Sequence, residues 1–406
     1  MIKVGIDIGN SKISCVVCDL KDNVNPRILS FTSMPTSNVN KSLFKNYEFL
    51  KKEVLTIINK AAKESQTDIK SVFLNLPLIS ASSEFYSSEI FLNNEKIDEL
   101  HLKKALNESI FFEEVENKEI IMNYISSYQL DGNIISTSPN GNYANQLLLN
   151  FYKLSSDKNI VRTYTNLFKE INIHIAKLIP TPISSALATL NKDDLDLGSI
   201  SIDLGHSNTS IALFENNKLV FCDTVNIGSK NITNDIARGI STTLESAERL
   251  KTLYGSVNSF PSDEFEIIEV PVVSSETNQF KQINRSSLNS IIKPRVEETL
   301  EIVWQKLKQY SFHKKKIKNL ILTGGGSQLE GISDYAQIIF DSNVRLGRPS
   351  NIIGLDKRFN GPEFSQTIGS VLFKEEEYQV DFIKKTQKQG KKSLKNEFFD
   401  WLDKYI

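Results

Sequence analysis

A short pattern occurs twice in this chain, once near the start and once at the middle. Residues 5–14 (GIDIGNSKIS) align with residues 201–210 (SIDLGHSNTS), so that Asp7 matches Asp203. Each copy is an apolar strand that ends in aspartate, a turn of small polar residues and a second alternating strand, which is the pattern of a β-hairpin. A repeat of this kind predicts two similarly built α/β domains that face one another, each with an aspartate at the mouth of its hairpin.

The spacing of apolar residues predicts the remaining elements. Steps of three and four residues indicate helices, and strict alternation indicates strands. The predicted helices are residues 51–62, 97–109 and 236–254, and the predicted strands are 84–92, 124–128, 146–154 and 265–273, with a turn at Pro139-Asn140-Gly141. A further long helix is expected to begin near Arg295, because Pro294 suits a first helical turn. This helix would carry Val296, Leu300, Val303, Trp304 and Leu307 inward.

These elements predict two core domains, each interrupted by an insertion. The predicted boundaries are 1–79, 160–190 and 355–380 for the first core domain, 80–159 for its inserted subdomain, 191–226 and 317–354 for the second core domain, and 227–316 for its inserted subdomain.

Composition limits the compartment and the partners. With 48 Lys and Arg against 49 Asp and Glu, no global field recruits nucleic acid, and none is expected as a partner. The start of the chain runs into a strand pattern without a basic leader, and there is no uncharged apolar run of about 18 residues, so the chain is expected to stay in the cytosol without spanning a membrane. Cys15, Cys18 and Cys222 are expected to be buried thiols rather than zinc ligands.

The two hairpin turns offer the groups that bind a nucleoside triphosphate. Phosphate oxygens need backbone N–H groups packed around them, and a divalent cation needs carboxylates that hold it through water. The turns 9–11 and 205–207 would supply the first, and Asp7 and Asp203 would hold Mg²⁺ through water in the cleft between the domains. The alternative is that each aspartate only caps a tight turn.

A third glycine-rich turn, residues 324–327, follows a strongly apolar strand. Bare glycines let a flat ring or a ribose approach the backbone closely. The turn is not a Walker loop, because the Lys-Ser/Thr ending is missing. Glu248 and Lys251 lie three residues apart on one face of a predicted helix, where they would hydrogen-bond a ribose or form a plain surface ion pair.

These motifs resemble those of the actin, Hsp70 and sugar-kinase superfamily. The two hairpins resemble its phosphate motifs, LTGGGS at 322–327 resembles its adenosine motif, and residues 179–188 and 364–371 resemble its two interdomain connecting helices. The resemblance implies an actin-like fold of two facing α/β domains joined at an ATP cleft, with an inserted subdomain in each half. It also implies ATP and Mg²⁺ as cofactors. The residues expected to contact the nucleotide are Asp7, Gly9, Asn10, Ser11, Lys12, Asp203, Gly205, His206, Ser207, Gly228, Glu248, Lys251, Gly324, Gly325, Gly326 and Ser327.

Within that superfamily the chain resembles the FtsA family of bacterial cell-division proteins. The stretches that carry this resemblance are 227–228 with 232–237, 247–255, and 130–132 with 139–141. The resemblance implies a peripheral protein on the cytoplasmic side of the inner membrane at the division site. There it would bind the FtsZ C-terminal peptide through Arg295 and Glu298, polymerise head to tail through the first insertion, and help to recruit later division proteins.

The second phosphate loop departs from the family pattern. That loop usually reads Asp-Ile-Gly-Gly-Gly-Thr-Thr, whereas His206, Ser207 and Asn208 follow Gly205 here, and Ser229 stands where a second glycine is common. Side chains narrow the loop, so we expect ATP binding with at most slow hydrolysis. His206 is either a structural turn residue or a general base.

The C-terminal segment has its own pattern. Residues 381–392 are polar and basic and predict a linker. Over 393–406, apolar side chains recur at helical spacing, which predicts an amphipathic helix that lies on an anionic membrane surface. The predicted membrane contacts are Leu394, Phe398, Trp401, Leu402 and Tyr405. The alternative is a last helix docked on the protein's own core.

Two other functions fit the same fold. A sugar or acetate kinase would need a substrate-positioning acid or base in the first domain and no membrane-seeking tail. An actin-like component of type IV pilus assembly would bind a different partner peptide.

Overall fold

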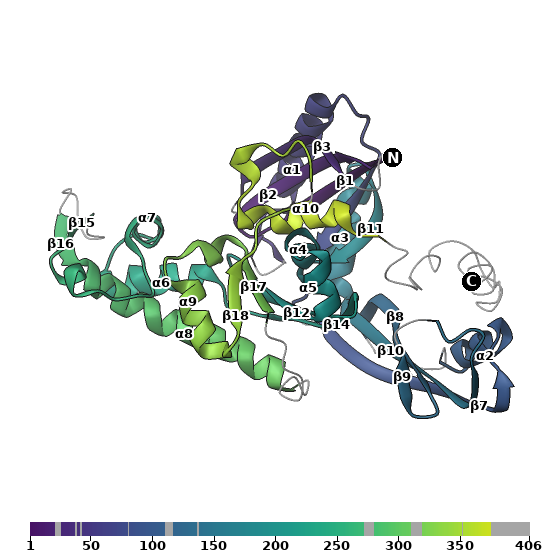
Figure 1. Cartoon of the computed structure of the whole chain (residues 1–406). Helices are drawn as coiled ribbons and strands as arrows, with labels where there is room; N and C mark the ends of the chain where they lie inside the picture. The colour runs from purple at the N-terminus through teal and green to yellow at the C-terminus, as the bar shows by residue number, and fades with distance from the viewer. Residues whose placement is uncertain are drawn as a thin grey trace. The chain divides into compact units, whose positions relative to one another are not determined.

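The computed structural model describes residues 1–20, 26–36, 39–40, 43–79, 81–109, 117–135, 138–271, 280–309, 319–350 and 352–374. The chain forms two compact units (Figure 1). The larger unit contains Met1–Ile79 and Arg162–Phe373, and the smaller contains Ser80–Val161. The predicted linker 381–392 and the predicted helix 393–406 lie outside the described residues.

The larger unit contains two five-stranded sheets with the same topology. The first has the order β11-β6-β1-β2-β3, and the second has the order β14-β13-β12-β17-β18. In each, the central strand is antiparallel to the hairpin strand that follows it and parallel to the strand on its other side. The strands of the first sheet are β1 (Ile2–Ile8), β2 (Lys12–Asp19), β3 (Arg27–Pro35), β6 (Ser71–Leu76) and β11 (His174–Pro180). Those of the second are β12 (Ser199–Leu204), β13 (Thr209–Glu215), β14 (Lys218–Val225), β17 (Asn319–Thr323) and β18 (Asn343–Leu346).

The two predicted hairpins are confirmed, and their registers match. Asp7 pairs with Ser14 across the first hairpin, and Asp203 pairs with Ser210 across the second. Both aspartates are therefore the second-last residue of a central strand, with the turn immediately beyond. The sequence repeat reflects a structural duplication.

Two short helices connect the two halves of the larger unit, where each half is one five-stranded sheet with the helices that pack on it. Helix α4 (Thr181–Thr189) follows the first sheet but packs on β12 and β13 of the second, whereas α10 (Ser365–Leu372) follows the second sheet and packs on β1 of the first (Figure 1). The helices touch closely, because a Cβ built on Gly369 would lie 1.6 Å from the Ser184 carbonyl oxygen. Both were predicted as connecting helices, and the helical assignment is confirmed.

The predicted helix 236–254 is wrong as one element, because it is two. Helix α6 (Ser229–Ile240) ends at Ser241, which has a left-handed φ of 54°, and α7 (Leu244–Tyr254) begins after Thr243. The Thr243 side chain accepts a hydrogen bond from the Ser246 N–H and so caps the new helix.

The predicted helix start near Arg295 is also wrong. Helix α8 (Arg285–Gln309) begins ten residues earlier and holds Pro294 in its interior. Proline removes one backbone hydrogen bond, but Leu288 and Ile292, which precede it, are fully buried. Packing on both sides of Pro294 therefore outweighs the local cost of the proline.

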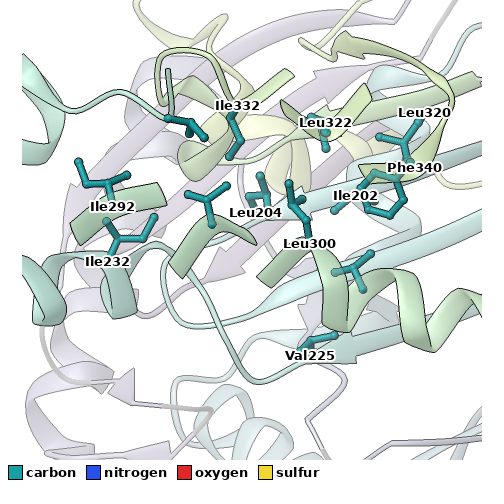
Figure 2. Close-up of a cluster of buried hydrophobic side chains, with 14 of the residues drawn as sticks. Ile202, Leu204, Val225, Ile232, Ile292, Leu300, Leu320, Leu322, Ile332 and Phe340 are labelled. Atoms are coloured by element: carbon teal, nitrogen blue, oxygen red, sulfur yellow. The ribbon is translucent and has the colours of Figure 1, made fainter. Parts of the chain in front are cut away.

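Helix α8 and the second sheet share one hydrophobic core. Figure 2 shows Ile202 and Leu204 of β12 and Leu320 and Leu322 of β17 facing Leu300 of α8. The predicted inward residues Val296, Leu300, Val303 and Leu307 are all buried, and Trp304 is partly buried with its ring 5.7 Å from that of Phe340. The helix is thus part of the second half's core along much of its length.

The smaller unit is a four-stranded antiparallel sheet of order β7-β10-β8-β9 covered by one helix. Its elements are β7 (Ser82–Lys96), α2 (Glu99–Ser109), β8 (Lys118–Leu130), β9 (Asn133–Ile135) and β10 (Tyr143–Asp157). The predicted strands 84–92, 124–128 and 146–154 are confirmed in longer form. The predicted turn is present, since the Asn142 N–H donates to the Pro139 carbonyl at 3.1 Å.

The remaining elements complete the two units. They are α1 (Tyr47–Ser65), α3 (Lys158–Glu170), α5 (Lys192–Leu197), α9 (Ile332–Phe340), β4 (Val39–Asn40), β5 (Leu43–Phe44), β15 (Ile267–Pro271) and β16 (Phe280–Asn284). All three cysteines are buried thiols outside any disulfide, as predicted. Among the helices of the described residues, none has the length and apolar character needed to cross a bilayer.

Candidate functional site

A pocket of about 720 Å³ lies in the larger unit at the two hairpin turns. Ligand pockets for small molecules are commonly roughly 300–1,000 Å³. Fourteen of the sixteen predicted nucleotide contacts line it: Asp7, Gly9, Asn10, Ser11, Lys12, Asp203, Gly205, His206, Ser207, Glu248, Lys251, Gly324, Gly325 and Gly326. Gly228 and Ser327 are not among the lining residues. The fold therefore gathers three separate sequence motifs around one cavity.

The two hairpin turns are closed by the same hydrogen bond. The Gly9 N–H donates to the Lys12 carbonyl at 3.0 Å, and the Gly205 N–H donates to the Asn208 carbonyl at 2.9 Å. A Cβ on Gly9 or Gly205 would lie 3.0 or 2.8 Å from the same carbonyl oxygen. Glycine at these positions is thus required by the turn itself.

Asp7 and Asp203 are buried at the base of the pocket, and each accepts a hydrogen bond from a side-chain amide. Asn75 Nδ2 donates to Asp7 Oδ1 at 3.3 Å, and Gln366 Nε2 donates to Asp203 Oδ2 at 2.9 Å. Burial raises the pKa of each carboxyl group to about 6, although these amides act in the opposite direction. The alternative role as a simple turn cap does not account for burial of both carboxylates in one pocket.

Lys12 brings a cation to the first turn. Its Nζ lies 3.7 Å from the centroid of the Phe364 ring. Burial lowers the pKa of Lys12 to about 8, and the carboxylates of Glu363 and Asp7 counteract that shift. A partly desolvated ammonium group beside the turn is suited to an anionic ligand.

The three glycines of the glycine-rich turn differ in the space around them. Gly324 has a φ of +81°, and a Cβ there would lie 2.2 Å from Asp203 Oδ1. A Cβ on Gly326 would lie 2.9 Å from the Leu204 carbonyl oxygen, whereas one on Gly325 would meet nothing closer than 3.6 Å. Gly325 lines the pocket without being constrained by the protein around it.

Glu248 and Lys251 form an ion pair on the pocket wall. Their Oε2 and Nζ atoms are 2.7 Å apart, and Thr233 Oγ1 donates to the same Glu248 oxygen at 2.5 Å. Lys251 Nζ also lies 2.9 Å from Thr233 Oγ1. The pair is therefore part of a three-residue network that presents polar atoms to the cavity.

Helix α6 supports the second turn from behind. The Ser229 N–H donates to the Gly205 carbonyl at 2.9 Å, and the Lys230 N–H donates to the His206 carbonyl at 2.8 Å. A Cβ on Gly228 would lie 2.6 Å from the His206 carbonyl oxygen, so Gly228 allows this close approach rather than lining the cavity. Burial lowers the pKa of His206, which keeps the imidazole neutral at pH 7.

Several buried polar atoms of the turns have no hydrogen-bond partner among the described residues. They are Asn10 Oδ1, Asp203 Oδ1, Ser207 Oγ and Asn208 Oδ1. Buried polar atoms are normally paired, so this group fits a polar ligand with a hydrated cation. Within the described ranges no three His, Cys, Asp or Glu side chains gather to hold a metal directly.

Sequence reasoning missed the residues that hold the aspartates. Asn75 is the second-last residue of β6 in the first sheet and Gln366 lies on α10, both far from their partners along the chain. The only local signal was that Gln366 belongs to the second predicted connecting helix. Asn208, noted as a departure from the loop pattern, was also not predicted as a ligand contact.

The predicted partner residues lie elsewhere on the larger unit. Arg295 donates from Nε to Asp235 Oδ2 at 2.5 Å and also pairs with Glu298 one turn further along α8. The Arg295 side chain is 25% exposed and the Glu298 side chain is 49% exposed. Neither residue lines the pocket.

Comparison with known sequences identifies similar proteins. The family model for cell division protein FtsA matches residues 200–369. Cell division protein FtsA of Rhizobium meliloti is 28% identical over 379 residues, which covers 91% of this chain and 86% of that protein. Cell division protein FtsA of Neisseria meningitidis is 24% identical, with 90% and 88% covered, and that of Bacillus subtilis is 26% identical, with 91% and 82% covered.

Solved structures share the fold at low sequence identity. A chain of the PilM-PilN type IV pilus biogenesis complex has a TM-score of 0.61 at 16% identity, with 91% of this chain and 97% of that chain covered. MreB5 of Spiroplasma citri bound to ADP has a TM-score of 0.53 at 12% identity, with 91% and 95% covered. The MamK double helical filament has a TM-score of 0.53 at 11% identity, with 91% and 98% covered. The predicted actin-like α/β fold is confirmed.

Proposed function

Because this chain is related to the FtsA cell-division proteins along nine tenths of its length, as its motifs predicted, we propose that it acts in bacterial cell division as an actin-like nucleotide-binding protein. The observation that carries the proposal is the duplicated pair of turns, with Asp7 and Asp203 buried in one pocket. The similar structure of MreB5, which is bound to ADP, supports a nucleotide in this fold.

The proposed ligand is ATP with Mg²⁺. The turns after β1 and β12, together with Lys12, would hold the phosphates, and Asp7 and Asp203 would hold Mg²⁺ through water. The glycine turn at 324–326 would lie against adenosine, and Glu248 and Lys251 would face the ribose. The unpaired oxygens of the turns supply acceptors for the water around the cation.

Gly325 gives a direct test of this placement by calorimetry with Mg-ATP. Because a side chain at Gly325 has room in the protein itself, Gly325→Phe should fold normally and lose ATP binding, and Gly325→Ala should fall between it and the wild type. Thermal unfolding without ligand is the control for folding. If Gly325→Phe and Asp203→Ala both bound Mg-ATP as tightly as the wild type, ATP would not bind in this pocket.

We propose that hydrolysis is slow or negligible. His206 and Ser207 occupy the second turn where the family loop has glycines, and side chains there narrow the space beside the phosphates. Phosphate release on the order of 10 per second, a usual rate for enzymes, would contradict this.

We propose that the nucleotide-bound protein tethers FtsZ at the membrane. In this scheme Arg295 and Glu298 on α8 bind the acidic FtsZ C-terminal peptide. Since Arg295 already pairs with Asp235, the peptide carboxylates would share or replace that contact. Arg295→Glu should weaken binding of an FtsZ tail peptide at least about tenfold in fluorescence anisotropy. Lys308→Glu on the same helix is the matched control, and equal binding by both variants would refute the placement.

The C-terminal segment 393–406 is the proposed membrane contact. Trp401→Glu puts a charge among the apolar positions, whereas Asn396→Glu puts the same charge among the polar ones. Only the first should release the protein from anionic vesicles in a pelleting assay. If both variants pellet like the wild type, the segment is not the anchor.

Self-assembly into filaments through the smaller unit, and recruitment of later division proteins, complete the proposal. The likeness to MamK, whose solved structure is a double helical filament, supports assembly of this fold. A chain without residues 82–156 should fail to assemble on lipid in negative-stain images, and unchanged filaments would contradict the role. The pilus alternative has weaker support, because likeness to PilM is one of fold at 16% identity.

A further inference from the structure

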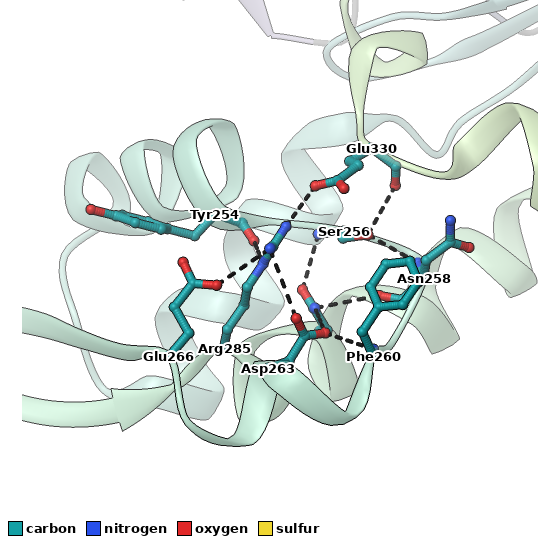
Figure 3. Close-up of polar contacts among 9 residues, drawn as sticks. Tyr254, Ser256, Asn258, Phe260, Asp263, Glu266, Arg285 and Glu330 are labelled. Carbon is teal, nitrogen blue, oxygen red and sulfur yellow. Dashed lines mark hydrogen bonds and ion pairs between the residues drawn. The ribbon is translucent and has the colours of Figure 1, made fainter.

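Arg285 stands at the junction of β16 and α8 and makes contacts in several directions. Its Nε donates to the Tyr254 carbonyl at 2.9 Å, and its Nη2 donates to Glu330 Oε2 at 2.6 Å. Its Nη1 lies 3.4 Å from Glu266 Oε2 and 3.8 Å from Asp263 Oδ1. Figure 3 shows the guanidinium pointing into the space between these groups. The side chain is 19% exposed, so it is a largely covered connector.

The two segments that Arg285 joins both contribute residues to the wall of the pocket. Tyr254 ends α7 and leads to Gly255, which lines the pocket with Leu253. Glu330 follows the glycine-rich turn and lines the pocket with Leu329. Leu253 and Leu329 thus give these two segments apolar side chains, against which a flat base would pack.

Backbone contacts between the same two segments lie directly beside the arginine. The Val257 N–H donates to the Glu330 carbonyl at 2.8 Å. Ser256 Oγ donates to the same oxygen at 3.4 Å, as Figure 3 shows. Ser256 is held in turn by α8, because its N–H donates to Asn289 Oδ1 at 2.9 Å. The walls are thus joined to each other and to α8 at one place.

An arginine is suited to this position by its shape. Its planar guanidinium presents donors in several directions at once, which a lysine ammonium on a flexible stem cannot reproduce. Here it satisfies a helix-end carbonyl and carboxylates from different segments.

We propose that Arg285 is a positioning residue that clamps the two walls of the base-binding end of the pocket, without itself touching the ligand. The inference rests on the proposed nucleotide function. Loss of the clamp lets α7 and the loop at Glu330 separate, which weakens contacts to the base and ribose. Contacts to the phosphates, which come from the hairpin turns, are unaffected.

The test compares three probes, each with Mg²⁺, by calorimetry: ATP, adenosine and inorganic tripolyphosphate. Arg285→Gln should weaken ATP and adenosine binding roughly tenfold, the scale of one lost charged hydrogen bond, and leave tripolyphosphate unchanged. Arg285→Lys should fall between Arg285→Gln and the wild type. Arg345→Gln is the matched control, because Arg345 also joins a carbonyl (Thr189) and a carboxylate (Asp194), but neither of the residues that it joins lines the pocket.

Hydrogen exchange at the Val257 amide gives a second readout. ATP should slow exchange there in the wild type and in Arg345→Gln, and much less in Arg285→Gln. If Arg285→Gln unfolds, Glu330→Gln, which removes only one arm of the clamp at a half-exposed residue, should show the same selective loss.

The outcomes separate the clamp from the function beneath it. A wild-type protein that does not bind ATP overturns both. Normal ATP affinity in Arg285→Gln, or equal weakening of all three probes, overturns the clamp alone.

Discussion

The two hairpin turns are copies of one device, yet they carry different chemistry. Both have a buried aspartate, an amide that holds it and the same closing hydrogen bond at glycine. The first turn carries the only lysine of the pair, Lys12, where the second has Asn208. The second is instead backed by the N-terminus of α6, which favours negative charge nearby. The two turns therefore share one geometry but differ in the source of positive charge, which is the Lys12 side chain at the first turn and the N-terminus of α6 at the second.

The two turns are alike at their aspartates. Substitution of these aspartates should have the largest effect, and the quantity that changes is the free energy of unfolding. Since burial raises the pKa of each carboxyl from 3.8 to about 6, ionisation in the folded state costs stability, at about 1.4 kcal/mol per pKa unit. That cost is absent below pH 4, grows as pH rises from about 4 to 6, and is constant above. Asp7→Asn and Asp203→Asn should each raise the free energy of unfolding by up to about 3 kcal/mol at pH 7.5 without nucleotide.

Denaturant unfolding at pH 7.5 and at pH 4 measures this difference. The gain should vanish at the lower pH. Asp356→Asn, at an exposed aspartate paired with Arg358, is the control without a gain. If Asp7→Asn and Asp203→Asn lowered the free energy of unfolding at pH 7.5, ionisation of the two buried carboxyl groups would not be the cost described.

Lys12 and Asn208 are where the turns differ. Lys12→Gln removes the cation of the first turn and should weaken Mg-ATP binding at least about tenfold. Asn208→Ala, at the matching position of the second turn, should change it by no more than about threefold. Equal losses at the two positions in calorimetry would mean that the charge is not divided as described.

The pH profile sharpens the same contrast at a smaller scale. ATP affinity should rise as pH increases through about 6, where Asp7 and Asp203 ionise, and fall above about 8, where Lys12 loses its proton. The alkaline fall should be missing in Lys12→Gln. If ATP affinity still fell above about pH 8 in Lys12→Gln, another group would cause that fall.

The smallest effect is expected at His206. The imidazole is neutral near pH 7 because burial lowers its pKa, so His206→Asn removes bulk but no charge. ATP affinity should change by less than about threefold, and phosphate release should stay slow. A loss of measurable turnover in this variant alone would favour the general-base alternative.

The sequence predicted what local patterns encode and missed what distant packing decides. The hairpins were predictable because strand, aspartate and glycine turn lie within a few residues. The break at Ser241 carried a signal, since Thr243 is a good N-cap, but an unbroken apolar spacing concealed it. Pro294 inside α8 had no local signal, because only the burial of Leu288 and Ile292 explains it.

The candidate site shows the same division. Its lining followed from three motifs. The amide of Asn75 and the contacts of Arg285 come from segments with no pattern linking them to the pocket, and Gln366 had only its place in the second predicted connecting helix. Gly228 was predicted as a contact because it belongs to a recognisable signature, yet it acts behind the turn as a spacer.

In the function proposed here, both aspartates serve one Mg²⁺-nucleotide in one pocket. Its most direct test is the ATP affinity of the wild type, Asp7→Asn and Asp203→Asn, measured by calorimetry with Mg²⁺ and with a chelator. We expect one ATP bound per chain, much tighter ATP binding with Mg²⁺ than with the chelator in the wild type, and little or no such difference in either variant. A variant that keeps the full Mg²⁺ dependence, or a wild type that shows none, would contradict it.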